Sequence, residues 1–114
     1  MPAYFIALNR CVHDRQRLER YWNAVGPTFQ GTGAKGLAIY TPLTMLEKLG
    51  SLEGAVVIEF PDVLAAKAWY DSPTYQEVKQ HRIGAADVEI FIIDGGVLPA
   101  EDRMPQTRDQ PRSQ

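Results

Sequence analysis

Two charged residues of this 114-residue chain stand among apolar neighbours. Glu59 is the only charged member of the run 55–60, AVVIEF, which has the composition of a strand. A buried carboxylate without a partner is costly and tends to take up a proton. Arg82 follows Tyr75 and Val78 at the spacing i, i+3 and i+7, which predicts a place on the inward face of a helix. Glu59 is therefore either a general acid or base, or the structural partner of Arg82.

Arg82 also suits a binding role, because a guanidinium can hold a substrate carboxylate through two parallel hydrogen bonds. Aromatic side chains would then form the walls of a pocket between the sheet and the helices. Trp69 fits either the core or the rim of this cleft, and Asp94 fits either a turn cap or the pocket. The residues expected at the pocket are Tyr4, Tyr40, Trp69, Tyr75 and Asp94.

The motifs predict neither a metal nor a cofactor. The chain lacks G-x-S-x-G, H-E-x-x-H, C-x-x-C and a phosphate-binding P-loop. Its two histidines, His13 and His81, are far apart in sequence, and two imidazoles cannot make a three-imidazole site. Cys11 is the single cysteine, so it can neither close an internal disulfide nor build a thiolate metal site alone.

The hydrophobic periodicity predicts the elements that position these residues. Strands are expected over residues 3–9, 35–45, 55–60 and 88–94. The helices between them give the order β-α-β-β-α-β. This order predicts an α+β, ferredoxin-like fold, in which a four-stranded antiparallel sheet carries its helices on one face.

Capping residues and prolines predict where the helices begin and break. Asp14 precedes a helix that is interrupted by Pro27. Asp62 caps a second helix that runs to about Tyr70, and Ser72 is the expected N-cap of a further one. The first helix carries one apolar stripe, formed by Leu18, Tyr21, Trp22, Val25 and Phe29.

The strands at 3–9, 55–60 and 88–94 carry apolar residues on both alternating sets, although helices are expected on one sheet face only. A monomer would then expose an apolar patch larger than the few hundred Å² that soluble monomers tolerate. A second copy would bury this patch in an interface of roughly 2,000 Å² or more. We therefore expect a homodimer in which two sheets face each other as a dimeric α/β barrel.

Composition limits the partners and the location. The formal net charge of −2 is the wrong sign for phosphate neutralisation, so nucleic acid is not an expected partner. No apolar run is long enough to span a membrane, and no signal-peptide pattern is present, which predicts a cytoplasmic protein. One domain is expected over residues 1–98, followed by a polar, proline-rich tail over 99–114 that is either loose or laid along a partner subunit.

Several short pieces of the second half have a recognisable spacing. Residues 57–61 read VIEFP and residues 68–75 read AWYDSPTY; Arg82, Ala85, Ala86, Asp94 and Gly95 follow. Together they resemble the DUF1330 family of small uncharacterised proteins. A weaker likeness through Tyr4, Pro27 and Gly33 extends the resemblance over about residues 3–96. The sequence departs from the family's pattern at residues 35–42, at His81 and in the tail. The resemblance implies a ferredoxin-like, dimeric α/β barrel and supplies no reaction.

Two functions remain open at this point. The first is a cofactor-independent enzyme acting on a small cyclic or carboxylated organic substrate, with Glu59 handling the proton and Arg82 the anion. The second is a non-catalytic dimeric ligand-binding protein in which Glu59 and Arg82 form a structural pair.

Overall fold

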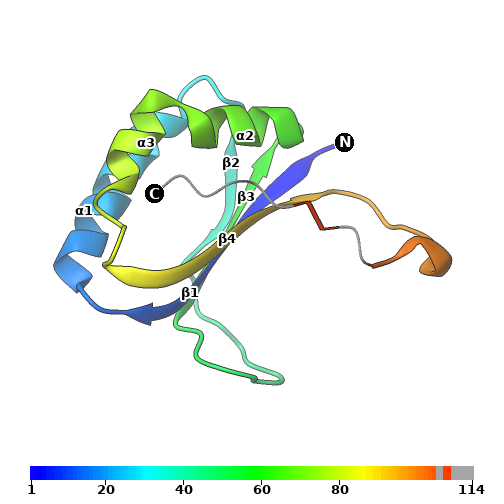
Figure 1. The fold of residues 1–114 in the computed structure, drawn as a ribbon, viewed down its shortest axis with the longest axis horizontal. Helices are drawn as coiled ribbons and strands as arrows, with labels where there is room; N and C mark the ends of the chain where they lie inside the picture. Colours follow the sequence, from blue (N-terminus) through cyan, green and yellow to red (C-terminus); the bar gives the residue numbers. More distant parts are fainter. Residues whose placement is uncertain (105–106, 109–114) are drawn as a thin grey trace.

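The protein is built on one antiparallel sheet, seen in a computed structural model that describes residues 1–104 and 107–108. The strand order is β2-β3-β1-β4. The α-helices of the described part cover one face of this sheet (Figure 1). The strands are β1 (Ala3–Val12), β2 (Lys35–Ile39), β3 (Gly54–Phe60) and β4 (Ala86–Asp94), and the helices are α1 (Arg15–Val25), α2 (Val63–Asp71) and α3 (Pro73–Lys79). The predicted α+β ferredoxin-like arrangement is confirmed.

The two central strands, β1 and β3, alternate between fully and partly buried residues. The fully buried set faces the helices, because side chains of a strand point alternately to the two faces of its sheet. Phe5 of β1 and Phe60 of β3 both belong to this set and meet the indole of Trp69 in α2, with ring centroids 5.1 and 5.7 Å from it. The core therefore lies between the sheet and the helices.

Each helix begins at the residue that the sequence predicts. Asp14 accepts a hydrogen bond from the main-chain N–H of Arg17 at the start of α1. Asp62 accepts one from the main-chain N–H of Ala65 at the start of α2. Ser72 caps α3. These side chains satisfy N–H groups that lack a partner in the first turn of a helix. The predicted break at Pro27 is confirmed, since α1 gives way to a 3₁₀ turn, η1 (Gly26–Phe29).

Three predicted boundaries are wrong. The second strand ends at Ile39 rather than at residue 45, because Tyr40 adopts the left-handed conformation with φ +54° and turns the chain away. The first strand continues to Val12, with a register shift between Asn9 and Cys11 that marks a β-bulge. Arg82 lies in the turn after α3, which ends at Lys79, rather than on the helix itself.

The face of the sheet away from the helices is called the open face here. Its side chains are mostly apolar, and Phe91 and Ile93 of β4 are 41% and 52% exposed. In register across the strands, the open face carries Tyr4, Ile6, Leu8, Lys35, Ala38, Ala55, Val57, Glu59, Glu89, Phe91 and Ile93. The sheet is thus apolar on both faces, as the sequence predicts.

Beyond β4 the chain extends away from the sheet (Figure 1) and forms a short 3₁₀ turn, η2 (Ala100–Asp102). Of the predicted tail, residues 105–106 and 109–114 lie outside the described part. Within the described residues, no helix is long and apolar enough to cross a membrane.

Candidate functional site

A cavity of about 450 Å³ lies where the end of β1 passes α1 and the start of the β2–β3 loop. We call it the α1 cavity. Its lining combines aromatic, charged and amide side chains from four separate segments of the chain. The lining residues are Asn9, Val12, Arg15, Trp22, Ile39, Tyr40 and Glu53.

One wall of the α1 cavity is aromatic. The rings of Trp22 and Tyr40 lie 4.8 Å apart between centroids, and the guanidinium of Arg15 lies 5.0 Å from the Trp22 ring. Tyr40 reaches this position because its ring crosses Gly54, where an added Cβ would lie 2.5 Å from the Tyr40 ring. The strained φ of Tyr40 and the missing side chain at Gly54 therefore act together to place the ring.

Two buried polar atoms of this lining have no hydrogen-bond partner among the described residues. They are Oδ1 of Asn9, a residue only 2% exposed, and Nε1 of Trp22. Such groups are uncommon in proteins because each costs about 1–3 kcal/mol. By contrast, one oxygen of the Glu53 carboxylate, Oε1, accepts the main-chain N–H of Val12 at 3.0 Å. Two residues that line the cavity therefore carry a buried acceptor and a buried donor without a partner of their own.

A second polar group lies deeper between the helices, the tyrosine–arginine cluster of Tyr21, Tyr75 and Arg82. The two tyrosine hydroxyls are 2.9 Å apart. Arg82 donates through Nη2 to the Tyr75 hydroxyl at 3.5 Å, and its guanidinium lies 5.6 Å from the Tyr21 ring. Burial, followed by the influence of Tyr75, raises the pKa of Tyr21, so its hydroxyl stays protonated. This cluster can donate hydrogen bonds but holds no base.

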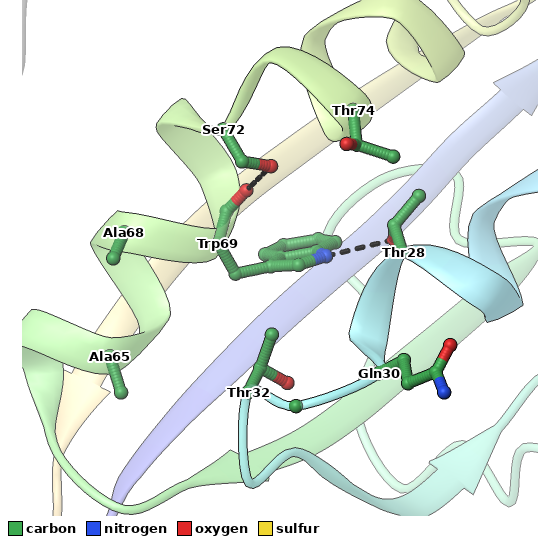
Figure 2. Close-up of a pocket in the computed structure, with 9 residues that line it drawn as sticks. Thr28, Gln30, Thr32, Ala65, Ala68, Trp69, Ser72 and Thr74 are labelled. Atoms are coloured by element: carbon green, nitrogen blue, oxygen red, sulfur yellow. Dashed lines mark hydrogen bonds between the residues drawn. The ribbon is translucent and has the colours of Figure 1, made fainter.

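A surface groove of about 420 Å³ separates α2 from the η1 segment (Figure 2). Trp69 forms part of it and donates from Nε1 to the hydroxyl of Thr28 at 2.9 Å. The hydroxyls of Thr28, Thr32 and Ser72 each donate to a main-chain carbonyl three residues earlier. These polar side chains are therefore used in building the fold, and the groove offers a ligand fewer free partners than the α1 cavity.

The predicted Glu59–Arg82 pair is wrong. Glu59 shares the open face with Val57, whereas Arg82 contacts the tyrosines packed against the opposite face. In register, Glu59 lies between Tyr4 of β1 and Lys35 of β2. Among residues 1–104 and 107–108, neither Glu59 nor Arg82 forms a salt bridge with any residue.

The other predicted site residues are scattered. Tyr75 and Arg82 do come together, as their spacing predicts, and Tyr40 lines the α1 cavity. Trp69 is 2% exposed and belongs mainly to the core. Tyr4 and Asp94 lie elsewhere, on the open face and at the exposed end of β4. Tyr4 is packed 3.4 Å from the position of a Cβ on Gly95.

The sequence patterns described above do not reveal the polar roles of Asn9, Tyr21 and Trp22. The sequence does contain a signal for Asn9, since it follows Phe5 and Ala7 among the residues of β1 that point inward. A buried amide at such a position is costly unless it has a hydrogen-bond partner. Tyr21 and Trp22 enter the hydrophobic periodicity only as members of an apolar stripe. Periodicity takes no account of the tyrosine hydroxyl and the indole N–H, which are the polar groups of these two side chains.

Solved structures with similar folds include both uncharacterised proteins and an enzyme. A protein of unknown function from Rhodopseudomonas palustris is 22% identical, covers 86% of this chain and 84% of its own, and has a TM-score of 0.66. A dimeric ferredoxin-like protein of unknown function from Thermobifida fusca is 17% identical, with coverages of 82% and 91% and a TM-score of 0.60. The hydroxynitrile lyase of Passiflora edulis is 15% identical, with coverages of 86% and 97% and a TM-score of 0.66.

Among curated proteins, no sequence gives a significant match. A family model does match, over residues 2–96, and its description is a domain of unknown function, DUF1330. The match spans most of the chain, including every strand and α-helix described above. The chain belongs to the DUF1330 family.

Proposed function

We propose that this protein is a homodimer that binds a small, flat, polar organic molecule in the α1 cavity. The observation that carries the proposal is that two residues lining one cavity, Asn9 and Trp22, each have a buried atom without a hydrogen-bond partner, Oδ1 and Nε1 respectively. A ligand that supplied a donor to the first and an acceptor to the second would remove the cost of leaving both unsatisfied.

The lining favours a particular ligand chemistry. An adjacent donor and acceptor occur together in primary amides, lactams and protonated carboxylic acids. A planar group of this kind would pack against the wall of Trp22 and Tyr40, whose rings are 4.8 Å apart. The volume of about 450 Å³ is within the range of roughly 300–1,000 Å³ typical of small-molecule sites.

Binding rather than catalysis is favoured by the position of the titratable groups. Glu59, the expected proton carrier, lies on the open face and is not among the residues lining the cavity. Glu53, the carboxylate that does line it, is held by the N–H of Val12. The hydroxynitrile lyase shares the fold at 15% identity, which supports a common architecture and not a common reaction.

Ligand binding can be tested with Trp22 as its own reporter. In a Trp69→Phe background, Trp22 is the only tryptophan, so its emission follows the cavity directly. We expect at least one of benzamide, 2-pyridone and benzoic acid, the last at a pH low enough to keep it protonated, to change this emission in a saturable way. Asn9→Leu should weaken that binding about tenfold or more, since one good hydrogen bond is worth about 1.5 kcal/mol.

A matched control and a stability measurement make the test sharp. Thr32→Val alters the separate groove of Figure 2 and should leave binding in the α1 cavity unchanged. Asn9→Leu removes an unsatisfied buried group, so the free energy of unfolding should stay level or rise by about 1 kcal/mol. Equal binding by the wild type and Asn9→Leu, or no response to any of the three compounds, would contradict the proposal.

The dimer is supported by the apolar open face and by similar proteins that are described as dimeric. Sedimentation velocity at micromolar concentration should give twice the chain mass of 12.8 kDa. Val57 lies between Ile6 and Ala38 on the open face, so Val57→Lys should give monomers. Leu64 is 77% exposed on α2, and Leu64→Lys should leave the dimer intact. A monomeric wild type would refute this part.

A further inference from the structure

Three potential metal ligands meet on the open side of the sheet. Cys11 is near the end of β1, His13 follows directly after this strand, and Asp87 is at the start of β4, opposite Cys11. One donor atom from each lies within 4.8 Å of the other two. His13 Nε2 and Asp87 Oδ2 are already 3.0 Å apart. None of the three takes part in the α1 cavity.

The β-bulge in β1 creates this meeting. Up to Asn9, the odd-numbered residues of β1 face the helices. The register then shifts so that Cys11 pairs with Asp87, which follows the open-face set of β4, and Val12 packs against the core. Without the shift, Cys11 would point inward with Asn9. Bulges of this kind often re-aim a side chain at a functional site.

The backbone holds these residues in place. The main-chain N–H of His13 donates to the carbonyl of Ala85 at 2.8 Å, and the N–H of Asp14 donates to the same carbonyl at 2.9 Å. These bonds fix the end of β1 against the start of β4. Cys11 on β1 and Asp87 on β4 therefore lie on paired strands, and His13 lies directly after β1 with its backbone tied to Ala85, so the three residues sit on a rigid frame, which metal sites require.

We propose that Cys11, His13 and Asp87 bind a divalent transition-metal ion of the zinc class. A thiolate, an imidazole and a carboxylate form a donor set suited to Zn²⁺ or Co²⁺, and the thiolate disfavours Mg²⁺ and Ca²⁺. The metal ion takes the place of the direct contact between His13 and Asp87, and the Cys11 thiol releases its proton to solvent on binding.

The charges fit such an ion. A thiolate and a carboxylate supply two negative charges against two positive ones, and neutral His13 adds none. In the single chain, the side chains of His13 and Asp87 are 50% and 65% exposed, and they lie at the end of the sheet where β1 finishes and β4 begins. Three protein ligands leave the fourth position of a tetrahedral site open to water or another ligand. The sequence motifs predict no metal because Cys11 has no second thiol to join it, and the mixed donor set of Cys11, His13 and Asp87 is the reason to revise that prediction.

Cobalt titration tests the proposal on the full-length, reduced, chelator-treated protein. Co²⁺ alone should bind one ion per chain and produce a thiolate-to-cobalt charge-transfer band together with the visible bands of tetrahedral cobalt. Zn²⁺ should displace it. Cys11→Ser should abolish the charge-transfer band. His13→Ala and Asp87→Asn should each weaken cobalt binding by at least about tenfold, since even indirect ligand partners contribute that much.

Two control variants separate this site from adventitious binding. His81→Ala removes the other histidine, and Glu89→Gln removes the next carboxylate on the same face of β4. Both should bind cobalt as the wild type does. The proposal is overturned if a thiol titration finds Cys11 free and reduced but no charge-transfer band appears. It is equally overturned if His13→Ala and Asp87→Asn leave the affinity unchanged.

Discussion

Replacing Trp69 by alanine should lower the free energy of unfolding by about 3–5 kcal/mol. The indole is 2% exposed and lies between several rings, with centroids 4.2 Å from Tyr75 and 4.6 Å from Phe29. Its Nε1 also donates to Thr28 at 2.9 Å. Because small domains are stable by only about 5–15 kcal/mol, the loss is a large fraction of the total.

The contribution of the indole can be divided experimentally. Trp69→Phe keeps an aromatic ring but removes the hydrogen bond to Thr28, and we expect a loss of about 1–2 kcal/mol. Thr28→Val removes the acceptor as well as its own bond to the carbonyl of Val25. In a double-mutant cycle, the coupling energy between positions 69 and 28 should be about 0.5–1.5 kcal/mol.

Urea denaturation followed by far-ultraviolet circular dichroism measures these losses without relying on tryptophan emission. A loss below about 1 kcal/mol for Trp69→Ala would refute the core assignment, because truncating a fully buried indole cannot cost so little in a packed interior. If the alanine variant does not fold, the cycle built on Trp69→Phe and Thr28→Val still decides. A coupling energy of zero would show that the observed hydrogen bond does not stabilise the fold.

Two further predictions concern the aromatic residues. Gly54→Ala should displace the Tyr40 ring and change the tyrosine signals in near-ultraviolet circular dichroism. Gly50→Ala, which has open space around it, should leave these signals unchanged. Identical spectra for the two variants would contradict the close approach of Tyr40 to Gly54. Burial raises the pKa of Tyr21 above its ordinary value of 10.0. The folded state therefore holds this proton more tightly than the unfolded state, and the resulting stabilisation is complete below pH 10.0 and is lost as the pH rises above it. Stability above about pH 10 should therefore fall less steeply in Tyr21→Phe than in the wild type, and parallel curves would refute the shift.

The sequence predicts the fold well because local signals and strand periodicity agree. Asp14, Asp62 and Ser72 all cap the helices they were expected to cap. The strand 55–60 shows why the two faces of the sheet are harder to assign. Glu59 points to the same face as Val57, because the two are two residues apart. The residues pointing to either face are mostly apolar, so the pattern alone does not say which face the helices cover.

The candidate site was less predictable because it depends on backbone events that side-chain patterns do not show. The left-handed conformation of Tyr40 ends β2 and brings its ring over Gly54. The bulge after Asn9 reverses which residues of β1 face outward, and so places Cys11 on the open side. Each event re-aims a side chain through a local change of the backbone at one or two residues, which hydrophobic periodicity does not detect.

The long loop between β2 and β3, seen at the bottom of Figure 1, divides the chain into two halves that are interleaved in the sheet. The first half holds β1 and β2, and the second holds β3 and β4. In the order β2-β3-β1-β4, every strand pair joins one half to the other, and neither half contains a strand pair of its own. Leu46 and Leu49 in this loop are fully or almost fully exposed and open to proteolysis. A chain cleaved there should stay together as a complex of two fragments, and the separated fragments should regain the fold only when mixed. The protein is thus a natural candidate for splitting into complementing halves.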